Sequence, residues 1–160
     1  MIWRSGIPAS ISEQRRITVR IVNECVFCAI EARELPSLVV QETETTISFL
    51  DHRPLFPGHV LVIPRIHHDT IEDLPPPQLI AVFEVVQRMS IAVRSAMDAP
   101  GTFIATNTVI SQSVPHFHVH VVPRRRGDGL RGFFWPRQPY DDDAHAESVR
   151  SLIADALASA

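Results

Sequence analysis

Histidine alternates with hydrophobic residues in one short segment, His116-Phe117-His118-Val119-His120-Val121-Val122. Successive side chains of a β-strand point to opposite faces, so a strand here would align three imidazoles on one face, about 7 Å apart. Its other face would bury the phenylalanine and a pair of valines. Imidazole titrates near neutral pH and acts as a nucleophile, a proton shuttle or a metal ligand. The segment therefore predicts a catalytic centre or a transition-metal site, with a solvated polar sheet face as the alternative.

The two cysteines of the chain form a C-x-x-C motif at Cys25 and Cys28. A redox pair of this spacing normally opens a helix after a strand in a βαβ unit, and nothing in the sequence indicates such a unit. Tetrahedral zinc needs four nitrogen or sulfur ligands, of which the motif supplies two. Half of a zinc site and a pair of structural thiols are therefore favoured over a redox pair.

The elements that must position these side chains indicate an α+β domain. Apolar residues recur every three or four positions between 78 and 98, which predicts a helix of about five turns after the prolines at 75–77. Acidic residues at 141–143 would cap a shorter last helix that ends near 158. Alternating or β-branched runs predict strands at 38–40, 45–50, 59–64, 102–106 and 116–122. The sum is an antiparallel sheet with a long helix packed on it.

The length and net charge of the chain limit its domain organisation and its classes of binding partner. With 160 residues the chain is expected to form one domain at 23–160, preceded by an N-terminal extension at 1–22. A net charge of −3 argues against a nucleic-acid or membrane-surface partner. No apolar run approaches ~20 residues, and the first segment has no signal-peptide core, so we expect a cytoplasmic protein.

Together these motifs resemble the histidine triad (HIT) superfamily, whose signature is H-φ-H-φ-H-φ-φ with φ hydrophobic. Segments 25–30, 49–51 and 57–67 also match the family, and Gln112-Ser113-Val114 resembles its lead-in to the triad. The similarity covers roughly residues 24–140. It implies a HIT-like fold with a five-stranded antiparallel sheet, a long helix, a shorter C-terminal helix and assembly as a homodimer.

The resemblance also implies an activity. HIT proteins bind nucleotides and cleave or transfer at the α-phosphate of a purine, commonly adenine, nucleotide through a covalent nucleotidyl-histidine. By this similarity His118 is the nucleophile, His120 contacts the phosphate or leaving group, and His59 orients the nucleophile. The closest subclass is a Hint-like nucleoside phosphoramidase. A dinucleoside polyphosphate hydrolase and a non-catalytic nucleotide-binding partner protein are the alternatives.

Substrate contacts follow from the same resemblance. The family aspartate that accepts hydrogen bonds from ribose hydroxyls corresponds to Asp51, which could also cap its own loop. The loop at 108–111 departs from the family form, with Ser111 where glycine is common. The remaining expected substrate contacts are Phe27, Ile30 and Phe49 around the base, and Asn107, Gln112 and Ser113 at the phosphate.

One branch of the superfamily carries C-x-x-C and is similar to this chain. In that branch a histidine after the strand end I-P-x-x-H and the first triad histidine complete a zinc site. Those positions are His67 and His116, with His68 as an adjacent alternative. Four protein ligands leave no open position, so Zn²⁺ would be structural and no catalytic metal is expected. The run Arg124–Arg126 would either attract a polyphosphate or form a solvated loop.

Overall fold

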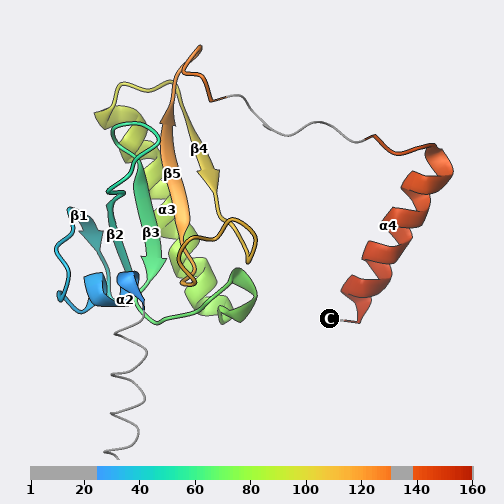
Figure 1. Ribbon diagram of the computed structural model, residues 1–160, viewed down its shortest axis with the longest axis horizontal. Helices are drawn as coiled ribbons and strands as arrows, with labels where there is room; N and C mark the ends of the chain where they lie inside the picture. The colour runs from blue at the N-terminus through green and yellow to red at the C-terminus, as the bar shows by residue number, and fades with distance from the viewer. Residues whose placement is uncertain (1–24, 131–138, 160) are drawn as a thin grey trace, which may run out of the picture. The chain divides into compact units, whose positions relative to one another are not determined.

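An antiparallel sheet of five strands forms the frame of the protein in the computed structural model, which describes residues 25–130 and 139–159 (Figure 1). The strand order is β1-β2-β3-β5-β4, so β3 and β5 lie inside the sheet and β4 at one edge. The strands are β1 (Val39–Glu42), β2 (Thr46–Leu50), β3 (Val60–Pro64), β4 (Gly101–Ala105) and β5 (Val119–Arg124). This is the α+β sheet that the sequence predicts.

The long helix α3 (Pro76–Ala96) covers one face of the sheet, behind the strands in Figure 1. Its proline start suits the first helical turn, where backbone N–H groups have no partner within the helix. An apolar stripe that includes Val82, Val86 and Met89 is buried against sheet residues such as Val62 and Val119. The helical period of the sequence thus selects the face that forms the main core.

The opposite face of the sheet holds a second core cluster beneath the short helix α2 (Val26–Glu31). Phe27 packs with its ring centroid 5.5 Å from that of Phe49, in an edge-to-face arrangement. Sequence reasoning leaves α2 unassigned, because its six residues make fewer than two turns in which an apolar period could repeat. This face carries the cysteines and the histidines.

The expected strand at 116–122 begins three residues late, at Val119. The reason lies in the backbone partners of the preceding segment. Phe117 N donates to His68 O at 2.6 Å and His116 N donates to Val114 O at 2.8 Å, so neither group joins the ladder with β3 or β4. The other expected strands and both helices lie within two residues of their expected bounds.

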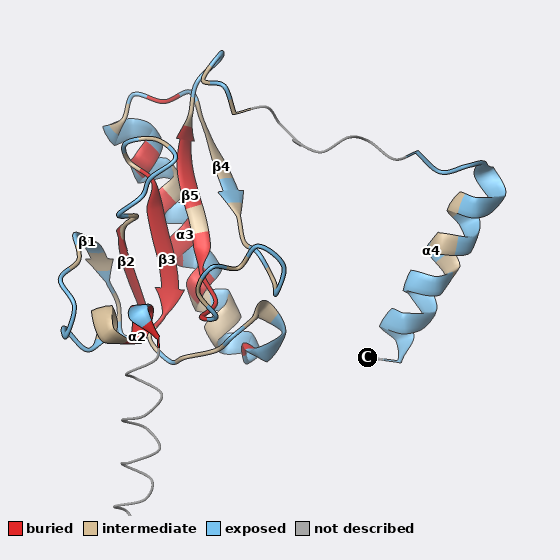
Figure 2. Ribbon diagram, in the orientation of Figure 1, coloured by how far each residue is buried: buried red, intermediate tan, exposed pale blue. Residues whose placement is uncertain are grey.

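Two further elements complete the described chain. A 3₁₀ turn, η1 (Ile71–Asp73), precedes α3, and the last helix is α4 (Asp143–Ala158). Asp142 caps α4 by accepting a hydrogen bond from His145 N at 2.7 Å. This helix belongs to a separate unit that starts at Gly129, and its residues are largely exposed (Figure 2). Among the described helices, none is long and apolar enough to cross a membrane. The expected extension at 1–22 lies outside the described residues.

Candidate active site and metal cluster

The alternation in the histidine segment separates two environments. Phe117, Val119 and Val121 enter the core cluster beneath α3. The imidazoles of His118 and His120 lie on the other face, with ring centroids 4.9 Å apart. The change in strand start therefore leaves the predicted two-sided arrangement intact, although the first two histidines precede β5.

His118 is buried, with 4% of its surface exposed, and its ring is fixed by the backbone. Its Nδ1 lies 2.7 Å from His116 O, and only a protonated nitrogen can donate to that carbonyl. The proton therefore occupies Nδ1, and Nε2 keeps its lone pair. Burial lowers the pKa of His118, which keeps the ring neutral at pH 7. A neutral imidazole with one free lone pair is the form required of a nucleophile.

His59 and His120 form a hydrogen-bonded pair beside His118. Leu55 N donates to His59 Nδ1 at 3.2 Å, so the proton of His59 occupies Nε2. His59 Nε2 then donates to His120 Nδ1 at 2.9 Å, which places the proton of His120 on its Nε2. Burial, together with the charges His118 and His59 would carry if protonated, lowers the pKa of His120 to about 4. Burial also lowers the pKa of His59.

A cavity of about 650 Å³ opens next to these rings, and we call it the histidine pocket. Its apolar wall comes from α2, the following loop and the sheet face. Its polar lining residues, whose side we call the polar end, include Asp51, Ser113, His118 and His120, and Ser37 and His52 also line the cavity. The apolar wall includes the expected Phe27, Ile30 and Phe49, together with Leu35, Leu38 and Leu61. An apolar chamber that ends in a few convergent polar groups is typical of small-molecule sites.

The position of Asp51 is compatible with both roles considered from the sequence, a ribose contact and a loop cap. Its Oδ1 accepts a hydrogen bond from Arg53 N at 2.8 Å, which closes the turn after β2. Its Oδ2 lies 3.4 Å from His59 Nδ1. The carboxylate therefore caps a loop, and Asp51 also lines the histidine pocket.

Two of the expected phosphate contacts lie elsewhere. Asn107 Nδ2 donates to Ser111 O at 3.3 Å, within its own loop. Gln112 Nε2 donates to Asp69 O at 2.5 Å, and Gln112 Oε1 accepts from Val109 N at 2.9 Å. Neither side chain lines the histidine pocket, whereas Ser113 does.

Cys25, Cys28, His67 and His116 converge on one point, and we call them the metal cluster. One ligand atom from each lies within 4.8 Å of all the others. Cys28 Sγ lies 3.2 Å from His67 Nδ1 and 3.5 Å from His116 Nδ1, and Cys25 Sγ lies 3.5 Å from His116 Nδ1. Ligands about 2.0–2.3 Å from one tetrahedral ion would be separated by about this much. Burial and the neighbouring Cys25 raise the pKa of Cys28 to about 12, so a thiolate here requires a compensating cation.

Outer partners orient both histidines of the metal cluster. His116 Nε2 donates to Pro64 O at 3.0 Å, and His67 Nε2 donates to Asp69 Oδ1 at 2.8 Å. Each bond leaves Nδ1 unprotonated and turned toward the sulfurs, as a metal ligand requires. His68, the alternative third ligand, instead has Nε2 2.8 Å from Gln78 Oε1 on α3.

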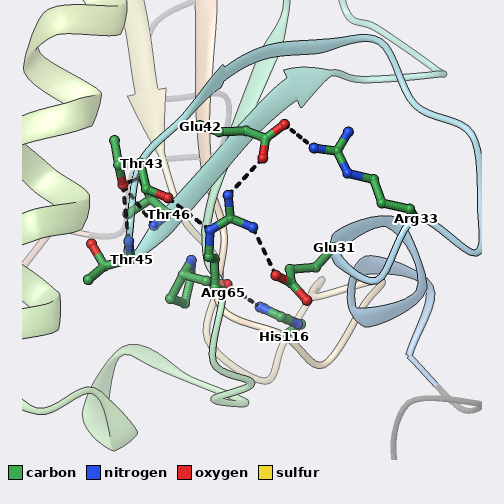
Figure 3. Close-up of polar contacts among 9 residues, drawn as sticks. Glu31, Arg33, Glu42, Thr43, Thr45, Thr46, Arg65 and His116 are labelled. Atoms are coloured by element: carbon green, nitrogen blue, oxygen red, sulfur yellow. Dashed lines mark hydrogen bonds and ion pairs between the residues drawn. The ribbon is translucent and has the colours of Figure 1, made fainter.

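Arg65, which follows Pro64 at the end of β3, connects the metal cluster to the sheet (Figure 3). Its guanidinium donates to Glu31 Oε1 of α2 at 2.8 Å and to Glu42 Oε2 of β1 at 2.7 Å. Its Nε donates to Thr43 O at 2.9 Å. Arg65 thus joins the helix that carries Cys28 to two strands.

Sequence reasoning missed Arg65 and Asp69. A carboxylate two residues after a candidate histidine ligand is a weak signal that could have indicated Asp69. The run Arg124–Arg126 does not line the histidine pocket. Arg124 Nε donates to Asp128 Oδ2 at 2.6 Å, and Arg125 donates to Met97 O, at the end of β5 away from His118.

The HIT domain family matches residues 32–127. The chain belongs to the HIT domain family. The HIT-like protein MT1300 of Mycobacterium tuberculosis is 38% identical over 141 residues, which are 85% of this chain and 97% of the relative. Adenosine 5'-monophosphoramidase HNT1 of Saccharomyces cerevisiae is 31% identical over 132 residues, which are 81% of each chain.

A solved HIT structure is also similar over most of this chain. The crystal structure of a zinc-bound histidine triad family protein from Mycobacterium smegmatis has a TM-score of 0.65 and 36% identity. The match covers 86% of this chain and 99% of that chain. The HIT fold expected from the sequence is therefore confirmed, with its five-stranded antiparallel sheet.

Proposed function

We propose that this HIT protein is a nucleoside phosphoramidase, which hydrolyses the P–N bond at the α-phosphate of a purine nucleotide. The observation that carries the proposal is the tautomer of His118. Its Nδ1 is fixed on His116 O at 2.7 Å, so the lone pair of Nε2 is free at the polar end of the histidine pocket. The similarity to the yeast adenosine 5'-monophosphoramidase supports the substrate class.

The reaction would proceed in two displacements at phosphorus. His118 Nε2 attacks the α-phosphorus, the P–N bond breaks, and the leaving nitrogen takes up a proton from the medium and departs as ammonia or an amine. A water molecule then attacks the same phosphorus and releases one proton to the medium, the bond to Nε2 breaks, and the nucleoside monophosphate leaves with a regenerated neutral imidazole. His120 also lines the pocket, and its Nε2–H would donate a hydrogen bond to a phosphate oxygen or the leaving atom. Splitting one displacement into two lowers each barrier.

The pocket suits a nucleoside at the other end of the substrate. The apolar wall, with Phe27, Ile30 and Phe49, would contain the base. The carboxylate of Asp51 would accept hydrogen bonds from the ribose hydroxyls. A purine offers the larger apolar surface for such a chamber.

Turnover of adenosine 5'-phosphoramidate by the wild-type protein and by His118→Ala tests the proposal. We expect the variant to lose about 10³-fold or more in kcat/KM, because it lacks the imidazole that would form the covalent intermediate. Arg88→Gln, on the exposed side of α3, serves as the control and should keep the wild-type rate. Wild-type turnover in His118→Ala would overturn the assignment. Diadenosine polyphosphates in the same assay distinguish the alternative hydrolase, and nucleotide binding without turnover would indicate a binding protein.

The metal cluster would hold one structural Zn²⁺ between Cys25, Cys28, His67 and His116. Support comes from the donor set, from the outer partners of both histidines, and from the zinc-bound relative. Protein purified without chelator should contain about one zinc per chain. Cys28→Ser should lower that content, whereas Ala29→Ser in the same helix should not. An equal zinc content in Cys28→Ser would contradict this site.

The sheet edge and one face of α3 suit a homodimer. β4 pairs only with β5 among the described strands, and exposed edges of this kind invite pairing with another chain. Ser90 Oγ lies 2.7 Å from Thr102 Oγ1, which places this part of α3 beside β4. Ile91 is 65% exposed and Ile104 is 43% exposed, so both would gain from burial. In sedimentation experiments the wild-type protein should be a dimer and Ile91→Glu should be a monomer. A monomeric wild type would contradict the proposal.

A further inference from the structure

The amide of Gln112 is engaged at both ends within the protein. Its Nε2 donates to Asp69 O at 2.5 Å, and its Oε1 accepts from Val109 N at 2.9 Å. These bonds use one of the two N–H groups of Nε2 and one lone pair of Oε1, and they hold the amide in place. It bridges two loops that are 43 residues apart in the sequence.

One of these loops, 107–113, needs such a support. Val109 has φ of 63° and Ser111 has φ of 62°, values in the left-handed region that non-glycine residues rarely adopt. The strain is greatest for Val109, because its side chain is β-branched. Backbone of this kind persists only where surrounding contacts hold it. The same loop ends at Ser113, which lines the histidine pocket.

The other loop, 67–69, is bound to the metal cluster. His67 Nδ1 lies 3.2 Å from Cys28 Sγ, and His67 Nε2 donates to Asp69 Oδ1 at 2.8 Å. His68 O accepts from Phe117 N at 2.6 Å, directly before His118. Asp69 thus receives His67 on its side chain and Gln112 on its backbone carbonyl. A contiguous path of contacts joins the metal cluster to the loop that ends in the pocket.

We infer that Gln112 is a positioning residue that couples metal binding to nucleotide binding, an inference that rests on the proposed function. An ion bound to His67 would restrict the motion of the 67–69 loop. Through its hydrogen bond to Asp69 O, Gln112 would then restrict loop 107–113, which ends at Ser113. A nucleotide in the pocket favours the same loop conformation. Linkage requires the two effects to be reciprocal: bound nucleotide tightens zinc binding by the factor by which zinc tightens nucleotide binding.

Zinc affinity measured with and without AMP tests the coupling. The dissociation constant for Zn²⁺ is obtained by competition with a chromophoric chelator, for wild type, Gln112→Ala and the control Gln41→Ala on β1. We expect saturating AMP to tighten zinc binding about fivefold or more in wild type and Gln41→Ala. Less than a twofold effect is expected in Gln112→Ala. An equal effect in Gln112→Ala, or none in wild type that binds AMP, would overturn the inference.

Hydrogen–deuterium exchange provides a test that needs no nucleotide. In zinc-loaded protein, amides 109–113 should exchange faster in Gln112→Ala than in wild type, while β3 amides stay protected and report the intact fold. Unchanged exchange in the loaded variant would refute the bridge. A titration of AMP into zinc-loaded wild type separates the two proposals. If AMP does not bind, the proposed function fails, and the exchange experiment still decides whether Gln112 orders the loop.

Discussion

His59 Nε2 lies 2.9 Å from His120 Nδ1, and their ring centroids are 5.1 Å apart. Leu55 N donates to the far nitrogen of His59, and with that tautomer the proton of His59 lies on Nε2 and that of His120 on its own Nε2. His120 also lines the histidine pocket. The pair gives the active site a donor whose direction does not depend on solvent.

Substitution of His120 should slow the proposed reaction more than substitution of His59 does. We expect His120→Ala to lower kcat about 10²-fold, since it loses the donor itself. His59→Ala should lower kcat about tenfold, since His120 remains but can rotate or change tautomer. Steady-state kinetics with adenosine 5'-phosphoramidate measure both, with Arg88→Gln as the control. A larger loss in His59→Ala than in His120→Ala would contradict this division of roles.

Stability should depend on pH through the buried imidazole of His120. Burial lowers its pKa from 6.5 to about 4 in the folded protein. Between these values the unfolded chain binds a proton that the folded chain does not, so the free energy of unfolding decreases as the pH falls. The slope from this residue should approach about 1.4 kcal/mol per pH unit. Urea unfolding at several pH values should show a shallower slope in His120→Gln. Because both proteins keep the metal ligands, their difference isolates His120, and parallel slopes would refute the prediction.

Arg65 should contribute to zinc affinity although it touches no ligand atom. Its guanidinium connects Glu31 on α2 to Glu42 on β1, and the preceding carbonyl of Pro64 accepts from His116. We expect Arg65→Gln to weaken zinc binding about tenfold, as for other outer partners of metal ligands. The zinc affinity of Arg65→Lys should lie between those of wild type and Arg65→Gln, because an ammonium cannot reproduce the fork of the guanidinium. Chelator competition measures the change, and Arg88→Gln on the exposed side of α3 is the control. Wild-type affinity in Arg65→Gln would show that α2 needs no such anchor.

Asp51 should distinguish ribose from deoxyribose. Asp51→Asn keeps an oxygen for Arg53 N and so preserves the turn, but it loses the charge that strengthens bonds from sugar hydroxyls. We expect KM for adenosine 5'-phosphoramidate to rise about tenfold. The 2'-deoxy analogue, which lacks one of those hydroxyls, should change much less. Equal changes for the two substrates would indicate that the carboxylate acts only as a loop cap.

Spacing along the chain was sufficient to predict the features that repeat. The helical period of α3 and the alternation from Phe117 to Val121 each determine which face enters the core. The same alternation places His118 and His120 together, because residues two apart on extended backbone share a face. The pairing of the cysteines with distant histidines required the family resemblance, since spacing does not show where separate loops meet.

The features that were missed depend on partners far apart in the sequence. Gln112 is bound to Asp69, 43 residues away, and Arg65 is bound to Glu31, 34 residues away. The start of β5 moved because Phe117 N donates to the carbonyl of His68. None of these pairs belongs to a periodic pattern. Only the folded chain shows that their polar groups already have partners.

His116 takes part in both sites through different atoms. Its ring faces the sulfurs, while its carbonyl oxygen accepts from His118 Nδ1 at 2.7 Å. The carbonyl belongs to the main chain, so it survives any substitution at position 116. A descendant of this protein could therefore lose the proposed metal ligand by point mutation and still keep the hydrogen bond that fixes the tautomer of His118. Metal binding and the tautomer of His118 can therefore change independently, although His116 contributes to both.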